Sequence, residues 1–111
     1  MEKLYYVYIV TNYKKTVLYT GITNDLEHRI LEHYLNRGTE NSFSSKYHTY
    51  HLLFYESSKY INNIIAREKE IKGWVRSKKE ALINTFNPEW KFLNEELFGQ
   101  WPPKEITTRN N

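Results

Sequence analysis

The N-terminal part of the chain contains two short segments rich in strand-forming side chains, and these constrain the fold more than any other feature. Residues 4–11 read Leu-Tyr-Tyr-Val-Tyr-Ile-Val-Thr, and residues 17–21 read Val-Leu-Tyr-Thr-Gly. Tyrosine, valine and isoleucine favour strands, while the polar residues 12–16 between the segments are typical of a turn. The sequence therefore predicts a β-hairpin near the N-terminus.

A helix, a loop and a third strand are expected after the hairpin. Asn24 resembles a helix N-cap, because Glu27 follows three residues on and completes a capping-box pattern. Gly38 is placed to end that helix. Residues 38–49 are polar and turn-rich, which favours a loop. The apolar run Leu-Leu-Phe-Tyr then predicts a strand over residues 51–56.

Two further helices are predicted in the second half of the chain. The first is expected over residues 60–72, with a serine at position 57 or 58 as its N-cap and Gly73 after its last turn. The second is expected to open at the capping pattern of Ser77 and Glu80. It ends at Asn87, because the residue before a proline disfavours helical backbone.

Length and composition restrict the chain to one domain without disulfides. A chain of 111 residues supports a single modest core, and the lack of cysteine excludes a disulfide scaffold, a thiolate zinc site and a cysteine nucleophile. The predicted elements indicate an α+β fold, a small three-stranded antiparallel sheet with helices packed against it. We expect this domain to span residues 1–98, followed by a C-terminal tail over residues 99–111.

No targeting or membrane signal is recognisable in the sequence. The N-terminal apolar run is too short for a signal peptide, and no other run approaches the roughly 20 residues that cross a bilayer. The simplest expectation is a cytoplasmic protein without a membrane partner. The 16 Lys and Arg against 13 Asp and Glu give a net charge of +3, which permits an anionic partner without requiring one.

One acidic residue, Glu68, interrupts the apolar stripe of the helix predicted over residues 60–72. The stripe comprises Ile61, Ile64, Ile65, Ile71 and Val75. At 3.6 residues per turn, Glu68 falls in the middle of this stripe. An ionised carboxylate there is costly unless it meets a cation, a metal or several donors. Two interpretations are open: a structural glutamate paired with Arg or Lys, and a metal-binding or catalytic glutamate.

Arg29 and His33 form a second candidate constellation. They lie four residues apart on the first predicted helix and therefore share a face. Arginine can bind a phosphate with two donors, and histidine can donate or accept a proton. A solvated helix face is the ordinary alternative, and the spacing by itself favours that alternative.

Tyrosine is unusually frequent, with 10 residues. Alternation along the first strand places Tyr6, Tyr8 and Val10 on one face and Tyr5, Val7 and Ile9 on the other. Cross-strand packing would explain most of these phenols. A phenol with its ordinary pKa near 10 is a poor base unless a cation stabilises its anion. Arg29 could supply that cation if the start of its helix folds back over the hairpin that carries Tyr19.

The positive charge is concentrated in residues 67–79, which contain six Lys or Arg and two Glu around Trp74. Such a cluster with an interleaved aromatic suits a phosphate-backbone track, and a basic solvated helix face is an equally good interpretation. The histidines at positions 28, 48 and 51 form no convincing metal set with His33. With only 4 glycines, the chain has no phosphate-binding glycine loop.

These residues together resemble the GIY-YIG nuclease superfamily, in particular its small stand-alone bacterial members related to the N-terminal domain of the excision-repair subunit UvrC. Residues 6–8, Tyr-Val-Tyr, stand where the family has Gly-Ile-Tyr, and residues 19–21, Tyr-Thr-Gly, where it has Tyr-Ile-Gly. The glycine of the first triplet is thus replaced by Tyr6, and the isoleucine of the second triplet by Thr20. The segment from Thr23 to Arg29, followed by His33, resembles the helix with the catalytic arginine.

Two later segments extend the resemblance to roughly residues 4–93. Residues 66–74 resemble the segment with the metal-binding glutamate, and residues 87–90, Asn-Pro-Glu-Trp, resemble the closing Asn-Pro-x-Trp of the small members. The resemblance implies the GIY-YIG fold. It also implies that Glu68 holds one divalent cation, Mg²⁺ or Mn²⁺, which suits a site of one carboxylate, waters and substrate phosphate.

The resemblance further implies a role for each site residue in hydrolysis of a phosphodiester. Tyr19 would act as, or orient, the general base for the attacking water, and Tyr8 would help to position that water. Arg29 would neutralise charge on the phosphate in the transition state, and His33 would assist as a second acid or base. Substrate contacts are expected from Lys46, Lys72, Arg76 and Asn87.

We therefore expect a metal-dependent endonuclease that cuts DNA, with a role in DNA repair or recombination. The alternative is a catalytically weak or inactive nucleic-acid-binding module with the same fold. A structural interaction domain is a third interpretation, but it leaves Glu68 and Arg29 unexplained. Because 111 residues leave no room for a specificity domain, structure-directed recognition, a homodimer or a protein partner would supply specificity. Trp101 and the prolines after it are candidates for a dimer contact.

Overall fold

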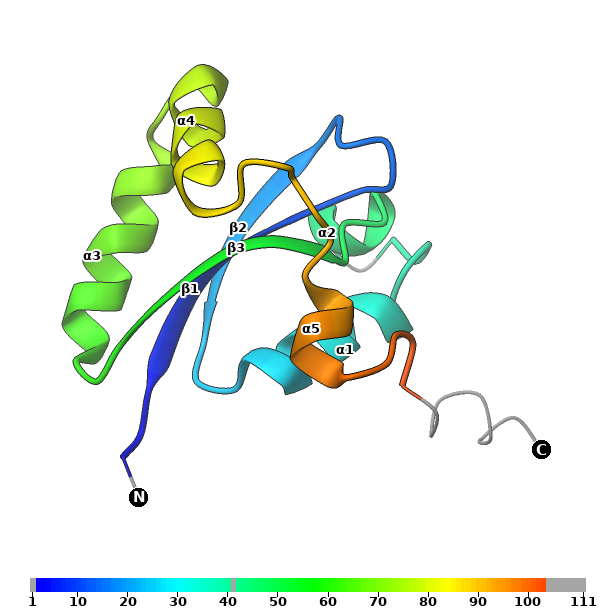
Figure 1. Ribbon diagram of the computed structural model, residues 1–111, viewed down its shortest axis with the longest axis horizontal. Helices are drawn as coiled ribbons and strands as arrows, with labels where there is room; N and C mark the ends of the chain where they lie inside the picture. Colours follow the sequence, from blue (N-terminus) through cyan, green and yellow to red (C-terminus); the bar gives the residue numbers. More distant parts are fainter. Residues whose placement is uncertain (1, 41, 104–111) are drawn as a thin grey trace.

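The three predicted strands pair into one antiparallel sheet in the computed structural model, which describes residues 2–40 and 42–103 (Figure 1). They are β1 (Tyr5–Thr11), β2 (Leu18–Thr23) and β3 (His51–Ser58). β1 lies in the middle of the order β2-β1-β3, so β2 and β3 are both edge strands. The predicted hairpin and third strand are confirmed, and β2 and β3 each run two residues beyond their predicted ends.

Helices follow the strands in the order that the sequence indicates, with two short additions. The helices of the described residues are α1 (Leu26–Leu35), α2 (Phe43–Lys46), α3 (Ile61–Lys72), α4 (Arg76–Phe86) and α5 (Asn94–Phe98), of which α2 and α5 are the additions. The α+β class with a small three-stranded antiparallel sheet is therefore confirmed. Within the described ranges, no helix is both long and apolar enough to cross a membrane.

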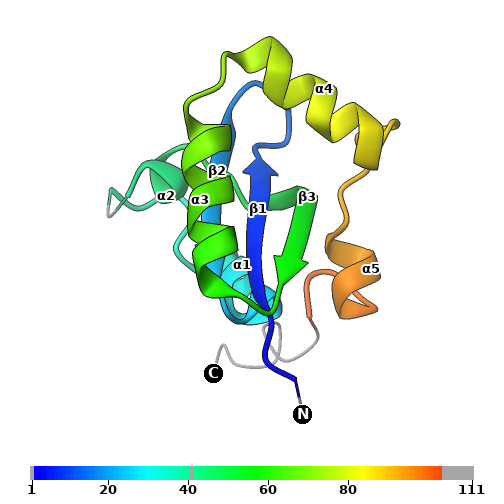
Figure 2. The ribbon, with the colours of Figure 1, turned by 90° about the vertical axis from the view of Figure 1, so that its left-hand side faces the viewer.

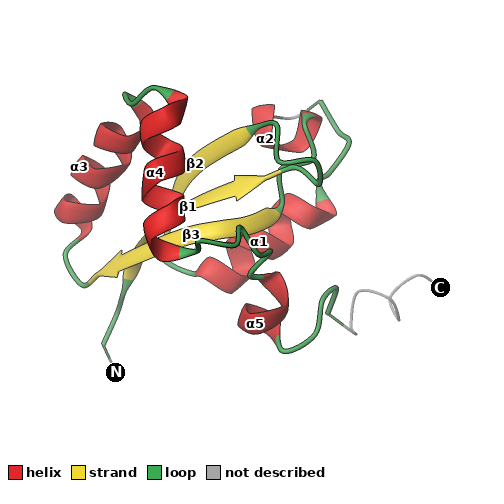
Figure 3. Cartoon of the chain, turned by 45° about the horizontal axis from the view of Figure 1, so that its top comes forward, coloured by secondary structure: helices red, strands yellow, loops and turns green. Residues whose placement is uncertain are grey.

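Helices cover both faces of the sheet, and the alternation of β1 decides which side chains meet which helices (Figures 1 and 2). On one face, buried Val7 and Ile9 pack with Ile64, Ile71 and Ile83 of α3 and α4. Figure 3 shows the sheet between this helix pair and the pair α1 and α5. On the second face the buried cluster comprises Tyr8, Val10, Leu26, Ile30, Leu52 and Leu93. The predicted division of the first strand into two faces is confirmed.

The register of the sheet places small and large residues opposite one another at its centre. Tyr8 of β1 lies opposite Gly21 of β2 on one side and Tyr55 of β3 on the other. The ladder between β1 and β3 is irregular between Ile9 and Val10. Gly21, the glycine of the second motif triplet, therefore lies in the sheet beside the ring of Tyr8 and not in the turn of the hairpin.

The predicted N-caps are wrong, each for a local reason, whereas Gly73 and Asn87 do end their helices. α1 is capped by Asp25, whose carboxylate accepts from the backbone N–H of His28, because Asp25 rather than Asn24 is the last extended residue. The serine expected to cap α3 belongs instead to the longer strand β3. Tyr60 occupies the cap position of that helix without a side-chain cap bond.

The start of α4 also differs from the prediction. Ser77 lies inside α4, which begins at Arg76 after Val75, and Glu80 pairs with Arg76 instead of closing a capping box. Val75 is 70% exposed and Ile61 is 45% exposed, so neither belongs to the buried stripe of α3. The stripe is narrower than the sequence indicates, with Ile64 and Ile71 as its buried members.

The segment over residues 38–49, predicted to be a loop, contains the short helix α2. Ser42 caps α2 by accepting from the backbone N–H of Ser45. Further along, Trp101 packs edge-on against Tyr34 and lies 5.0 Å, between ring centroids, from Phe98. The region around α2 contributes directly to the candidate site.

Candidate functional site

The candidate site is organised around the phenol of Tyr8, which is completely buried in the central strand. Its ring fills the space beside Gly21 on the neighbouring strand. A Cβ atom at position 21 would lie 2.6 Å from Cζ of Tyr8 and closer still to its hydroxyl oxygen. Only a residue without a side chain leaves room for the ring here. The glycine thus allows the Tyr8 hydroxyl to reach the α1 side of the sheet.

Arg29 and His33 of α1 meet this hydroxyl from one helix face. The Nε of Arg29 donates to Tyr8 Oη at 3.2 Å, and Tyr8 Oη lies 2.7 Å from Nε2 of His33. A second donor of the guanidinium, Nη1, binds Glu32 Oε1 at 3.1 Å. Spacing by four residues along α1 produces this arrangement, because such residues are neighbours on a helix surface. The predicted Arg29–His33 pair therefore does share a face, and that face is not a freely solvated one.

The other ring nitrogen of His33 is held by the segment between α1 and β3. Ser44 Oγ lies 2.7 Å from His33 Nδ1, and the hydroxyls of Ser44 and Thr49 donate to each other's backbone carbonyls at 3.0 and 3.1 Å. The two hydroxyl oxygens also lie 2.6 Å apart, so one of them donates to the other. Because Tyr8 Oη accepts from Arg29, its own hydrogen is available to Nε2 of His33, an arrangement that fits the tautomer with the proton on Nδ1.

Burial sets the charges within this network. Desolvation raises the pKa of Tyr8 to about 12, although Arg29 acts in the opposite direction. Desolvation also lowers the pKa of His33 to about 4, with the nearby charge of Arg29 adding to the effect. At neutral pH both rings are therefore uncharged, and the guanidinium of Arg29 is the positive group of the network.

Tyr19 lies beside this network at a more exposed position. Its ring contacts the ring of His33 edge-on, with 5.6 Å between centroids, and stacks on Phe43 of α2. Among the residues described, its hydroxyl has no hydrogen-bond partner. Electrostatic interaction with Tyr19 contributes to the raised pKa of Tyr8, which shows that the two phenols are close. Tyr19 is the phenol of the pair that a solvent molecule or substrate can reach.

Glu68 belongs to α3 and Arg29 to α1, two helices that pack on opposite faces of the sheet. Its side chain is only 17% exposed, and Oε2 forms an ion pair with Lys72 at 3.0 Å. No hydrogen bond or ion pair within the described ranges joins Glu68 to Tyr8, Tyr19 or Arg29. The physical reason is the layering, because α3 packs on the Val7 face and α1 on the Tyr8 face. A ligand shared by the two faces would have to reach around the edge strand β2.

The donor set around Glu68 suits only one kind of metal. In the described part of the chain, no group of three or more His, Cys, Asp or Glu could hold an ion. That excludes a site there built from three or more such side chains. It fits Mg²⁺ or Mn²⁺, since such ions are held by one or two carboxylates and complete their shell with water and phosphate oxygens. Glu68 is a carboxylate of this type.

The residues predicted to bind substrate are dispersed, and most are engaged elsewhere. Lys46 lies on α2 with its ammonium 5.7 Å from the ring centroid of Tyr47. Lys72 pairs with Glu68. Arg76 pairs with Glu80 and donates to the backbone carbonyls of the hairpin turn.

Asn87 is a buried structural link. Its amide nitrogen donates to the carbonyls of Leu53 and Lys91, and its oxygen accepts from the backbone N–H of Lys91. These bonds tie β3 to the segment after α4. A phosphate could bind this amide only after it gave up those partners.

The basic segment is less free than its composition indicates. Arg67 is bound to Glu56 and Glu70, and these carboxylates raise its pKa further. With Lys72 and Arg76 also paired, half of the positive charges of the segment face acidic partners. This pattern favours a solvated, salt-bridged helix surface over a continuous phosphate track.

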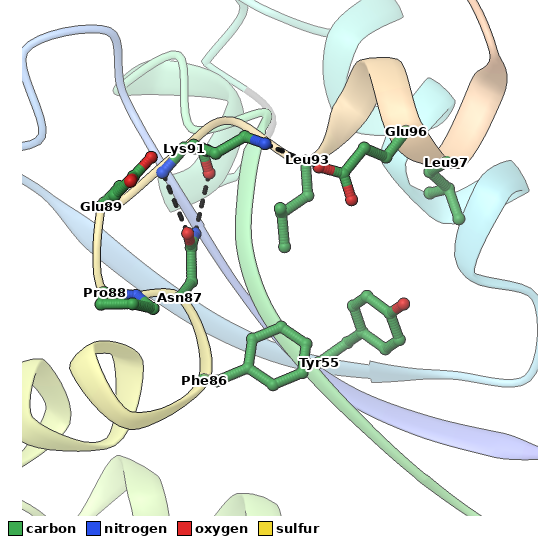
Figure 4. A pocket seen from close by; sticks show the side chains of 9 residues that line it. All are labelled: Tyr55, Phe86, Asn87, Pro88, Glu89, Lys91, Leu93, Glu96 and Leu97. Atoms are coloured by element: carbon green, nitrogen blue, oxygen red, sulfur yellow. Dashed lines mark hydrogen bonds and ion pairs between the residues drawn. The ribbon is translucent and has the colours of Figure 1, made fainter.

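A hollow of about 460 Å³ lies away from this network, between the end of α4 and α5 (Figure 4). Tyr55, Phe86, Leu93 and Leu97 supply its apolar lining. Three of its polar side chains are engaged, since Asn87 binds backbone groups and Lys91 pairs with Glu96 at 3.1 Å. It contains none of the residues around Tyr8, and the candidate chemistry therefore lies on the shallower surface beside β2.

The contributions of Ser44, Thr49, Glu32 and Phe43 were not predicted from the sequence. The Ser42 cap before α2 was the signal that could have revealed ordered structure in this segment. Nothing in the local pattern shows that Ser44 and Thr49 face a histidine. Their placement depends on how the segment packs against α1.

Comparisons with known proteins identify the family of this chain. The profile of the GIY-YIG catalytic domain family matches residues 4–81, which carry the three strands, α1, the whole of α3 and the first half of α4. A UPF0213 protein of Haloquadratum walsbyi is 35% identical over 82 residues, which cover 74% of this chain and 89% of that protein. A UPF0213 protein of Staphylococcus saprophyticus is 36% identical over 84 residues, covering 76% of this chain and 98% of that protein. No solved structure gives a significant match.

Proposed function

The chain belongs to the GIY-YIG catalytic domain family, and on that premise we propose that it is an endonuclease that hydrolyses DNA phosphodiester bonds. GIY-YIG domains are nuclease domains, and these nucleases generally use a divalent metal. The resemblance of its motifs to the N-terminal domain of the excision-repair subunit UvrC supports DNA repair or recombination as the setting that we propose.

One observation carries the proposal, the hydrogen-bonded pair of Tyr8 and His33 that has the fixed guanidinium of Arg29 on Tyr8 and the phenol of Tyr19 against His33. Arg29 is anchored through Nε to Tyr8 and through Nη1 to Glu32, while Nη2 has no partner among the described residues. The side chain is 38% exposed, so its outer edge faces solvent. A guanidinium held in this way can bind a phosphate without first losing its own conformational freedom.

Tyr19 and Arg29 divide the work at the phosphate. The hydroxyl of Tyr19 orients a water molecule, and it releases its own proton to solvent as it takes the proton of that water, whose oxygen attacks phosphorus. The bond to the leaving oxygen breaks, and that oxygen takes a proton from solvent. Arg29 donates to the phosphate oxygens, on which negative charge develops in the transition state.

Tyr8 and His33 act as positioning residues in this scheme. Tyr8 is fully buried and cannot meet the attacking water directly, which differs from the role expected from the family resemblance. It holds Arg29 in place, and His33 holds Tyr8. A neutral His33 matters because a second positive charge beside Arg29 would repel the guanidinium.

Glu68 is the residue that would hold the divalent ion. A bound Mg²⁺ or Mn²⁺ would supply positive charge to the phosphate. Because α3 and α1 pack on opposite faces of the sheet, a phosphate that meets both this ion and Arg29 would lie at the edge of the sheet beside β2. The low exposure of Glu68 and its single cationic partner support this assignment, because few other interactions would have to be lost. The structural alternative, a glutamate held by Lys72 alone, predicts no effect of Glu68 on cleavage.

The rival function is a binding module without cleavage, and one observation favours it. Tyr6 replaces the first motif glycine, and its ring packs edge-on against Tyr55 with 6.4 Å between centroids. This bulk stands on the same face as Tyr8. The two functions differ in whether the phosphodiester is broken.

The test is a cleavage assay on purified protein with Mg²⁺ or Mn²⁺ and linear, nicked, branched and single-stranded DNA. We expect cleavage of at least one substrate by the wild type and strong loss of it in Arg29→Gln. Arg37→Gln is the matched control, because Arg37 is an exposed arginine that lies over Tyr34 and has no contact with Tyr8. Binding without cleavage of any substrate would support the rival function.

A further inference from the structure

Two aromatic side chains of α2 are exposed beside the reactive end of the candidate site. Phe43, the first residue of α2, is 52% exposed, and Tyr47, its C-cap, is 42% exposed. Exposed large apolar groups that gather in one place commonly mark a binding surface. We call Phe43 and Tyr47 the aromatic platform.

The platform continues directly from Tyr19. The ring of Phe43 stacks on that of Tyr19 at an interplanar angle of 21°, with 6.3 Å between centroids. Tyr47 packs on Phe43 with 4.7 Å between centroids. The three rings form a row that begins at the phenol assigned to the attacking water and leads outward over α2.

A positive charge accompanies the platform. The ammonium of Lys46 lies 5.7 Å from the ring centroid of Tyr47. An exposed aromatic face with an adjacent cation is the combination that binds single-stranded nucleic acid, in which bases stack on rings and phosphates meet lysine. A paired base in a duplex presents only its edges, because its faces are covered by the neighbouring base pairs.

We propose that Phe43 and Tyr47 stack on unpaired bases next to the scissile phosphate, so that the substrate class is DNA with a single-stranded stretch at the cleavage site. This inference rests on the proposed function for its connection to cleavage. The binding that it describes does not require cleavage, and the two can be tested separately.

A second copy of the chain is the main alternative occupant of the platform. Stable protein interfaces bury about 800 Å² on each partner, and two partly exposed side chains fall well short of that. The alignment of the platform with Tyr19 is also unexplained by self-association, whereas a nucleotide next to the scissile bond would require it. The nucleobase is therefore the occupant that we argue for.

The experiment measures binding in EDTA, where cleavage cannot contribute. A single-stranded oligonucleotide containing 2-aminopurine and the same sequence as a duplex are titrated with protein, following polarisation and 2-aminopurine fluorescence, which falls when the base stacks on an aromatic ring. The variants are Phe43→Leu, which keeps an apolar side chain without a π-face, and Tyr47→Ala. Tyr60→Ala is the matched control, because Tyr60 is 60% exposed and has Lys59 5.7 Å from its ring centroid.

We expect preferential binding of the single strand with quenched fluorescence, weakened about five- to a hundredfold in Phe43→Leu and in Tyr47→Ala and unchanged in Tyr60→Ala. Equal affinity for both DNA forms, or wild-type quenching in Phe43→Leu, would overturn the proposal. So would sedimentation that shows a wild-type dimer dissociated by Phe43→Leu, since a second copy would then occupy the platform. Cleavage of DNA without this binding pattern would support the proposed nuclease function and overturn the role of the platform. The expected binding pattern without cleavage of any DNA would support the platform and overturn the proposed nuclease function.

Discussion

The ring of Tyr8 occupies the space that a side chain at Gly21 would need, across the ladder between β1 and β2. This relationship connects Gly21 to the proposed hydrolysis of a phosphodiester, although Gly21 itself contacts no substrate in our scheme. Because Tyr8 holds Arg29, anything that moves the Tyr8 ring also releases the guanidinium.

Gly21→Ala should therefore impair both stability and cleavage. The new methyl group overlaps the phenol, and overpacking of this kind costs about 1–3 kcal/mol. Gly73→Ala is the control, because a Cβ there would meet nothing closer than 3.6 Å, and we expect it to be neutral or slightly stabilising. Chemical denaturation and a cleavage assay of both variants measure the difference, and equal behaviour of the two would contradict our account of Gly21.

Thr20→Val should stabilise the protein. Thr20 is 4% exposed, and its hydroxyl is the buried side-chain polar atom without a partner in the described part of the chain. Removing such a group relieves a penalty of about 1–3 kcal/mol. Thr11→Val is a matched control with the opposite sign, because the hydroxyl of Thr11 donates to the carbonyl of Val17 at 2.7 Å. Urea unfolding that shows the same direction for both variants would refute the interpretation of Thr20.

Stability should decrease as pH falls from about 6.5 to about 4. Within this range the unfolded chain binds a proton at His33 that the folded protein excludes, since the folded pKa is about 4 against an ordinary 6.5. This proton uptake favours the unfolded state by at most about 3 kcal/mol, which corresponds to the full difference between the two pKa values. Below about pH 4 both states are protonated and the dependence ends.

His51 contributes to the same dependence, because burial lowers its pKa to about 4 as well. The two histidines can be separated by unfolding His33→Asn and His51→Asn in urea at pH 7 and pH 4.5. Each variant should lose part of the difference between the two pH values. If His33→Asn retains the full wild-type difference, His33 is not buried as a neutral ring.

Glu68→Gln should abolish metal-dependent cleavage while the protein stays folded. The amide keeps the size of the side chain and loses the charge that holds the cation, for which we expect a loss on the order of a hundredfold or more. Loss of the pair with Lys72 should cost less than about 1 kcal/mol. Glu70→Gln is the control on the same helix, because Glu70 is exposed and pairs with Arg67. Cleavage by Glu68→Gln at the wild-type rate would remove the metal assignment.

The hairpin and the alternation of β1 could be predicted because strand periodicity is a local property. The position of Glu68 within an apolar stripe was visible for the same reason, since 3.6-residue periodicity places it between Ile64 and Ile71. The fold class follows from the order of such elements. Each of these features depends on residues that are neighbours in the sequence.

The contacts within the site could not be predicted in this way. Arg29 meets Tyr8 across 21 residues and His33 meets Ser44 across 11, so both depend on tertiary packing. α2 was missed because four residues are too few to show a helical period. The helix caps failed where adjacent residues, such as Asn24 and Asp25, are equally suitable and packing decides between them.

The most direct test of the central claim is single-turnover cleavage of DNA by Tyr19→Phe, beside Tyr55→Phe as a half-buried tyrosine of the same sheet. If the Tyr19 hydroxyl takes the proton of the attacking water, its removal should slow cleavage about 10²- to 10⁴-fold. DNA affinity and the urea midpoint should not change, and Tyr55→Phe should cleave normally. Cleavage by Tyr19→Phe at the wild-type rate would contradict the assignment of this site.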